Sequence, residues 1–120
     1  MLADSFYKIV EEKEIQQGEF LYGVRINPEH EIYKAHFPGY PITPGVCIIK
    51  IATELLGLRY PGARLSCADN VKFLTPLFPD KDEVIVFSFK ERGEGSFGVT
   101  VSGNQVYSKM KIGILVPKKD

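Results

Sequence analysis

HFPGYPITPGV, residues 36–46, is followed by the apolar segment CIIKIATELLGL, residues 47–58. Proline and glycine in the first segment indicate a rigid turn after its leading histidine. Thr43 can cap a helix, and Pro44 suits the first helical position, where the N–H that proline lacks is not needed. The second segment is apolar on almost every side, so a helix at about residues 44–58 is expected to be buried on every side. In a chain of 120 residues, a curved sheet wrapped around one central helix achieves this.

The remainder of the chain is typical of strands, because apolar and polar residues alternate along it. Residues 5–12 fit a helix or a strand, and a strand is favoured because Gln16-Gln17-Gly18 resembles a turn into the next strand. Further strands are predicted at residues 18–27, 65–77, 83–90, 97–101 and 106–116. The sequence thus predicts an α+β fold, with a curved antiparallel sheet around one apolar helix. We expect a single domain of residues 1–120, in which residues 116–120 form a short tail.

The composition excludes several functional classes. Lys and Arg together number 15, as do Asp and Glu, so no basic excess points to nucleic acid or to an anionic membrane surface. Cys47 and Cys67 have neither a metal-ligand spacing nor the pattern of a disulfide framework, and Cys47 is expected to be a buried thiol. The chain shows no signal-peptide pattern and no apolar run of membrane-spanning length, so a cytoplasmic location is expected.

Three polar residues interrupt the apolar helix: Lys50, Thr53 and Glu54. Their spacing places them on one stripe, which continues to Val46 at the helix start. Charges on an otherwise buried helix are costly unless they are paired or hydrated, so the stripe is expected to face a cleft, a subunit interface or both. Two interpretations remain open: a Lys50–Glu54 ion pair that covers an interface, or a stripe that lines a substrate tunnel.

The start of the helix offers a site for an oxygen that gains negative charge. The backbone N–H groups of Gly45 and Val46 lie in the first turn and have no acceptor within the helix. The helix dipole adds positive potential there, so a polarised carbonyl or an enolate oxygen would be stabilised. His36 precedes the turn, and a histidine with its ordinary pKa of about 6.5 can take a proton at cytoplasmic pH. His30, which lies between acidic residues, is expected to be solvated.

A family resemblance rests on the string His-Phe-Pro-Gly-x-Pro-x-x-Pro-Gly-Val at residues 36–46 and the long apolar helix after it. It resembles the hot-dog-fold 3-hydroxyacyl-[acyl-carrier-protein] dehydratases of the FabZ type. Residues 70–79, NVKFLTPLFP, are similar to the family's strand after the helix, and the similarity runs from about Ile26 to the C-terminus. The resemblance implies the hot-dog fold and an obligate dimer with active sites at the subunit interface. It also implies no metal or redox cofactor, because the acyl group arrives on the phosphopantetheine arm of an acyl carrier protein.

The family's reaction, carried over to this chain, makes His36 the base that takes the α-proton of a 3-hydroxyacyl thioester. Gly45 and Val46 would then bind the thioester carbonyl through their backbone amides. Phe37 and Tyr40 would border the acyl channel or pack in the core. In the family, a carboxylate on the partner's central helix assists departure of the hydroxyl as water.

Position 50 departs from the family pattern. The family has its carboxylate fourteen residues after the histidine, where this chain has Lys50, and the family's glutamine four residues further on is matched by Glu54. A desolvated Lys50 could itself act as the general acid. Glu54, one helical turn or about 5.4 Å further along the same face, could supply the carboxylate. As a third possibility, another protein could supply it in a heterodimer.

Three functions follow from these alternatives. The leading expectation is an enzyme, a (3R)-hydroxyacyl-[acyl-carrier-protein] dehydratase of fatty-acid or related lipid or polyketide synthesis, acting as a homodimer or higher homo-oligomer. The second is a non-catalytic or half-site acyl-binding subunit of a heteromeric dehydratase, and the third is a hot-dog acyl thioesterase. Lys34, Arg64 and Lys72 could attract an acidic carrier protein.

Overall fold

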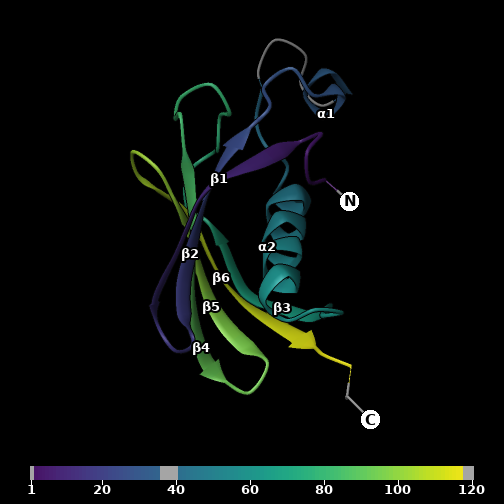
Figure 1. The fold of residues 1–120 in the computed structure, drawn as a ribbon. Coiled ribbons are helices and arrows are strands. Elements are labelled where there is room, and N and C mark those ends of the chain that lie inside the picture. Colours follow the sequence, from purple (N-terminus) through teal and green to yellow (C-terminus); the bar gives the residue numbers. More distant parts are fainter. Residues whose placement is uncertain (1, 36–40, 118–120) are drawn as a thin grey trace.

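The computed structural model describes residues 2–35 and 41–117 of the chain. Within these ranges the chain forms an antiparallel sheet of six strands in the order β1-β2-β4-β5-β6-β3. The strands are β1 (Tyr7–Gln16), β2 (Glu19–Ile26), β3 (Arg64–Phe73), β4 (Ile85–Gly93), β5 (Ser96–Ser102) and β6 (Val106–Leu115). Two helices complete this part of the chain, α1 (Glu31–Ala35) and α2 (Gly45–Arg59), and α2 lies against one face of the curved sheet (Figure 1). None of the helices in the described ranges has both the length and the apolar character needed to cross a membrane.

Alternation along the strands decides which face of the sheet meets α2. In β5, Phe97, Val99 and Val101 are buried, and the residues between them point to the opposite face. These side chains join Ile51 and Leu55 of α2 in one hydrophobic core. The predicted α+β fold, a curved antiparallel sheet against one apolar helix, is therefore confirmed.

One face of α2 remains uncovered, which corrects the expectation of a helix buried on every side. Val46 and Leu58 keep 72% and 56% of their surface exposed, and Lys50 is exposed as well. The sheet curls around only one side of the helix, and no strand or helix of the described residues covers the other side. The exposed positions Val46 and Lys50 belong to the predicted stripe, whereas the exposure of Leu58 was not expected from its apolar side chain.

The start of α2 also differs from the prediction. The helix begins at Gly45 with Pro44 as its N-cap residue, and no side chain caps it. Thr43 is buried, and its hydroxyl forms a 2.8 Å hydrogen bond with the hydroxyl of Tyr33. A buried partner in α1 therefore takes the hydroxyl that the local sequence predicts as a helix cap.

The N-terminal part confirms one prediction and corrects another. Residues 7–16 form a strand, and the turn into β2 contains Gly18 with a φ of 79°, which glycine adopts without strain. The short helix α1 is absent from the sequence prediction, and the expectation that His30 is merely solvated is wrong. Its ring packs edge-on against Phe6 with 5.1 Å between centroids, and its Nδ1 accepts a 3.1 Å hydrogen bond from the N–H of Ile32. His30 thus caps α1.

Strands β1 and β3 form the two edges of the sheet. Most of β3 is exposed, including Leu65 and Phe73 with 44% and 53% of their surfaces accessible. Its pairing with β6 shifts register between Asp69 and Lys72, next to Asn70 with a φ of 50°. Because β3 pairs with β6 on one side only, its other side presents backbone groups to which a further strand can bind.

Candidate active site

A pocket of about 280 Å³ opens at the start of α2. It is formed by the loop before the helix, the first helical turn, and the end of β3 with the loop after it. The residues that line it are Ile42, Thr43, Pro44, Gly45, Ile48, Phe73, Thr75, Pro76 and Leu77. The N–H of Thr43 donates a 2.8 Å hydrogen bond to the carbonyl of Leu77, which fastens the two loops to each other. The pocket lies where the sequence predicts a site for an anionic oxygen.

Two backbone amides at this pocket are available to a ligand. Hydrogen bonding within the first turn begins with Cys47, whose N–H donates to the carbonyl of Pro44 at 3.0 Å. The N–H groups of Gly45 and Val46 have no acceptor among the described residues. These donors stand at the positive end of a helix of 15 residues, an arrangement that favours a bound negative charge.

Phe73 forms the apolar wall of the pocket next to these amides. A Cβ atom placed on Gly45 would collide with the Phe73 ring, so the close approach of strand and helix requires glycine at this position. The ring is only half buried, with 53% of its surface exposed. The sequence does not predict a role for Phe73 in the site, because this contact joins an edge strand to a helix that precedes it in the chain.

His36, Phe37 and Tyr40 lie outside the described residues. The residues on either side of that segment are held together by the buried hydrogen bond between Tyr33 and Thr43. Burial raises the pKa of Tyr33 to about 12, so its hydroxyl keeps its proton at neutral pH. The tyrosine therefore fixes the two ends of the segment that contains His36, one of which leads directly into the pocket lining.

Lys50 is the polar residue of α2 that remains accessible. It is exposed and lies one helical turn after Val46 on the uncovered face. It also lies close to Cys47: burial raises the pKa of that thiol, and the Lys50 ammonium acts in the opposite direction. The ion pairs formed within the described ranges join Arg25 to Glu83 and Arg59 to two glutamates of β1, so Lys50 is not engaged in one.

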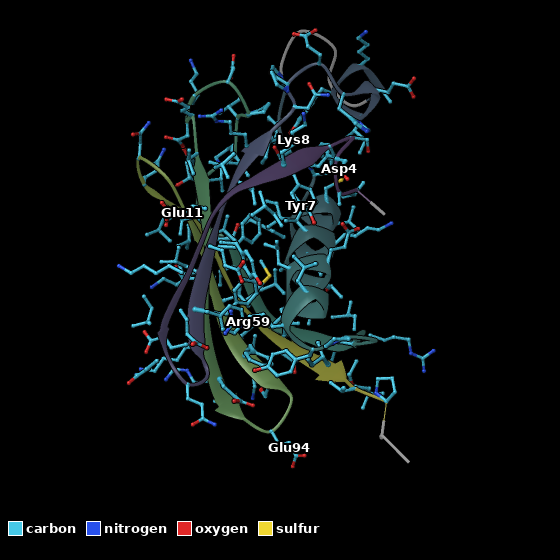
Figure 2. The ribbon with its side chains drawn as sticks, in the orientation of Figure 1. Asp4, Tyr7, Lys8, Glu11, Arg59 and Glu94 are labelled. Atoms are coloured by element: carbon cyan, nitrogen blue, oxygen red, sulfur yellow. The ribbon has the colours of Figure 1, made fainter. Side chains whose placement is uncertain are left out.

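Glu54 is held by the N-terminal segment. Its Oε2 accepts a 2.8 Å hydrogen bond from the N–H of Leu2, and its Oε1 accepts from the N–H of Ala3 at 3.1 Å and from the Tyr7 hydroxyl at 3.0 Å. Figure 2 shows Tyr7 on the side of β1 that faces α2. Burial, followed by the hydrogen bond to Glu54, raises the pKa of the Tyr7 hydroxyl. Both carboxylate oxygens of Glu54 are thus occupied within the chain, a role that the sequence does not predict.

The structure thus places Gly45 in the pocket lining, with Val46 next to it in the first helical turn, and Lys50 on the exposed face of α2, while Glu54 is directed to the N-terminal segment. The hydroxyl of Thr53 donates a 2.9 Å hydrogen bond to the backbone carbonyl of Ile49 in the same helix. Among the residues that the structure describes, no three histidine, cysteine or acidic side chains are grouped to hold a metal ion.

Comparison with known families gives a consistent result. The sequence profile of the ApeI-like family, described as ApeI dehydratase, matches residues 11–111. A curated 3-hydroxyacyl-[acyl-carrier-protein] dehydratase FabZ of Fusobacterium nucleatum subsp. nucleatum is 31% identical over 85 residues, which make up 66% of this chain and 57% of that protein. The FabZ of Haemophilus influenzae (strain 86-028NP) is 30% identical over 112 residues, or 82% of this chain and 76% of that protein.

Solved structures share the fold. One chain of the dehydratase heterocomplex ApeI:P from Xenorhabdus doucetiae superposes with a TM-score of 0.77 at 22% identity, covering 89% of this chain and 96% of that chain. An uncharacterized protein from Erwinia carotovora subsp. atroseptica gives a TM-score of 0.69 at 18% identity, covering 91% and 93%. These similarities confirm the hot-dog fold.

Proposed function

The chain belongs to the ApeI-like dehydratase family, and we propose that it takes part in the elimination of water from a 3-hydroxyacyl thioester. The observation that carries this proposal is the pocket at the start of α2, where the first helical turn offers the N–H groups of Gly45 and Val46, which have no acceptor among the described residues. The substrate would reach this pocket in the cytoplasm on the phosphopantetheine arm of an acyl carrier protein, and the reaction needs no metal or redox cofactor.

In the proposed reaction His36 removes the proton from the carbon next to the thioester carbonyl. The electron pair of that C–H bond moves toward the carbonyl oxygen, which gains negative charge beside the amides of Gly45 and Val46. A carbon–carbon double bond then forms as the C–O bond at the neighbouring carbon breaks. The departing hydroxyl takes a proton and leaves as water, so a proton donor is required within reach of that hydroxyl.

Lys50 is the better placed of the two donors that α2 could offer. Its side chain is on the exposed face of α2, one helical turn after Val46. Both carboxylate oxygens of Glu54, in contrast, are occupied by hydrogen bonds from the N-terminal segment and Tyr7. An ammonium group can give up a proton to a departing hydroxyl and recover it from the solvent. In a chain that acts with copies of itself, we assign the donor role to Lys50.

A second candidate function is a half-site within a heteromeric dehydratase. It is favoured by Lys50, since the acid within α2, Glu54, is occupied by the N-terminal segment, and by the uncovered surfaces of α2 and β3. One solved structure with this fold is described as a dehydratase heterocomplex. In such a pair His36 of this chain would act with a carboxylate from the other subunit, and the pair would hold one complete site of this kind.

The pairing surface proposed for either case is the edge strand β3 together with the exposed face of α2. Leu65, Phe73 and Leu74 expose about half of their surfaces near this edge, and Val46 and Leu58 expose 72% and 56% of theirs on α2. A second hot-dog subunit that extends the sheet at β3 would cover these residues and pair the free backbone groups. It would also bring a second α2 close to the pocket.

The deciding experiment measures enoyl product by mass spectrometry, with a 3-hydroxyacyl acyl carrier protein as substrate. Four preparations are compared: the native chain, the chain with a second hot-dog subunit from the same genome, K50E, and K13E as a matched charge change on β1. If the chain acts alone, native protein and K13E form enoyl product. If it is a half-site, only the mixed pair and K50E do. His36→Ala should lower whichever activity is found by about 100-fold or more. Absence of enoyl product in every preparation, or release of free thiol in its place, would refute the dehydratase proposal.

A further inference from the structure

The face of the sheet opposite α2 carries a groove that runs along β5. The residues of β5 that point away from the core are all small: Ser96, Gly98, Thr100 and Ser102. At Gly98 both neighbouring strands bear long side chains, Lys90 and Lys111, whereas Thr100 is flanked by Ser88 and Lys109. We call this the β5 groove, with Gly98 and Thr100 as its floor, and it encloses about 530 Å³.

Three cations, Lys90, Arg92 and Lys109, line the β5 groove together with Ile15, Glu19 and Leu21 from the β1–β2 side, and a fourth cation, Lys111, stands next to Gly98 in register. Lys90 and Arg92 project from β4 on one side, and Lys109 and Lys111 project from β6 on the other, all of them exposed. The strand register places Gly98 between Lys90 and Lys111, and Thr100 beside Lys109. Arg92 reaches over the floor, because a Cβ atom on Gly98 would lie 3.3 Å from its Nε.

The charge of these cations is not neutralised within the described part of the chain. The ion pairs there are Arg25–Glu83 and those of Arg59 with β1, and none includes a cation of the groove. Two acids lie near these cations: Glu19 lines the groove opposite Lys90 in register and accepts a 2.8 Å hydrogen bond from Gln16, and Asp69 is opposite Lys111. Since the whole chain has a formal net charge of +0, the groove is a local concentration of positive charge rather than part of a basic protein.

We propose that the β5 groove binds an acidic α-helix of a partner protein. The cations of β4 and those of β6 are separated by two strand spacings, about 10 Å, which matches the diameter of about 10–12 Å of a helix with its side chains. A floor of glycine and threonine lets the helix approach the sheet. Carboxylates on both flanks of the helix would then meet Lys90 and Arg92 on one side and the β6 lysines on the other. This surface lies on the other face of the sheet from the pocket at α2, so the inference is independent of the proposed dehydratase function.

The test titrates the native chain with a synthetic cross-linked helical peptide of about four turns, the length of β5, with glutamates along two flanks. Binding is followed by calorimetry and by amide chemical shifts. We expect shift changes confined to β4, β5 and β6, and affinity that falls with added salt. The double reversals K90E/R92E and K109E/K111E should each weaken binding at least tenfold, whereas K8E/K13E, the same charge change on β1, should leave it unchanged.

Shape is tested separately from charge. Gly98→Leu keeps every cation and fills the floor, so it should also weaken binding at least tenfold. If a reversal variant does not fold, judged by thermal melting, the pair K90Q/K109Q replaces it with the same expected direction. The proposal fails if the peptide does not bind, if Gly98→Leu binds as tightly as the native chain, or if inorganic phosphate produces the same shifts and displaces the peptide, since that would identify a site for small anions.

Discussion

Phe73 of β3 lies directly over Gly45, the first residue of α2, so that a methyl group at position 45 would collide with the aromatic ring. This contact sets the distance between the edge strand and the helix start. It also defines one wall of the pocket that contains the free amides. The first prediction follows from it.

Gly45→Ala is expected to destabilise the chain by about 1 kcal/mol, the lower end of the cost of overpacking, because the half-exposed Phe73 ring can move partly aside. Gly57 is the matched control, since it lies in the same helix and a Cβ atom there meets nothing within 4 Å. Gly57→Ala should stabilise the chain by up to about 1 kcal/mol through helix propensity. Urea unfolding measures both, and G45A/F73A should recover part of the loss. Equal effects of the two alanines would contradict the contact.

Tyr33→Phe is expected to change the response to alkali. Burial raises the pKa of Tyr33 to about 12 in the folded chain, against the ordinary value of 10.0 for tyrosine. Because the folded pKa is the higher one, the unfolded chain loses this proton first, and stability present below pH 10 is lost as the pH rises toward 12. Between pH 9 and pH 11, ionisation of this residue should lower the free energy of unfolding of the native chain by about 1.3 kcal/mol. The Tyr33→Phe variant should not show this decrease.

At neutral pH the same variant should lose about 1 kcal/mol, since the buried Thr43 hydroxyl loses its partner. It should also lower the dehydratase rate, because the two ends of the segment around His36 are no longer joined. Tyr107→Phe is the control: burial and Asp82 raise the pKa of Tyr107 to about 12 as well, but it does not line the pocket. Guanidinium unfolding at several pH values and the enoyl assay measure these effects. If Tyr107→Phe lowers the enoyl-forming activity as strongly as Tyr33→Phe does, the proposed role of Tyr33 in holding the segment around His36 is wrong.

Glu54 and Tyr7 are expected to be energetically coupled. A double-mutant cycle with Glu54→Gln and Tyr7→Phe should give a coupling of about 1–3 kcal/mol, since the hydrogen bond involves a charged acceptor. Glu54→Gln should also speed hydrogen exchange at the amides of Leu2 and Ala3, which donate to this carboxylate. Additive effects together with unchanged exchange would show that the N-terminal segment is held by other contacts.

Arg59 is expected to contribute more than a surface ion pair. Its guanidinium contacts Glu12 and Glu14 and lies 4.2 Å from the centroid of the Phe20 ring. Arg59→Met keeps the aliphatic packing and should cost about 1–2 kcal/mol, because this cation is mostly buried against an aromatic ring. Arg25→Met, which removes an ion pair with Glu83 between exposed side chains, should change the unfolding free energy by less than about 0.5 kcal/mol. Thermal melts at low and high salt would separate the two, and equal losses would contradict the cation–π contribution.

The fold could be predicted because its signals are local. Alternation in residues such as Phe97, Val99 and Val101 marks strands that are buried on one face, and the apolar run after Pro44 marks the helix against which they pack. The amides of Gly45 and Val46 could be predicted for the same reason, since the lack of an acceptor in a first helical turn is a property of the helix alone.

The remaining features depend on partners distant in the sequence. Thr43 is of a residue type that often caps helices, but its hydroxyl forms a hydrogen bond with the buried Tyr33 hydroxyl and not with the helix. The spacing of Glu54 along the helix predicts a place on the catalytic stripe. In the structure, however, its carboxylate oxygens accept hydrogen bonds from backbone amides of the N-terminal segment. Phe73 approaches Gly45 only because β3 is placed beside the helix start by its pairing with β6. No periodicity within a single segment encodes such encounters.

The exposure of Lys50 has an evolutionary consequence. Its side chain lies outside the hydrophobic core and in no ion pair within the described residues, so exchanges at this position carry little folding penalty. Exchange between lysine and an acid is therefore close to neutral for the folding of a single chain, and selection on it would act through the proposed chemistry and the proposed pairing surface. After a gene duplication, one copy can lose its acid at position 50 without becoming unstable, provided that the other copy retains it. Mutual dependence between two subunits can then arise in a single step.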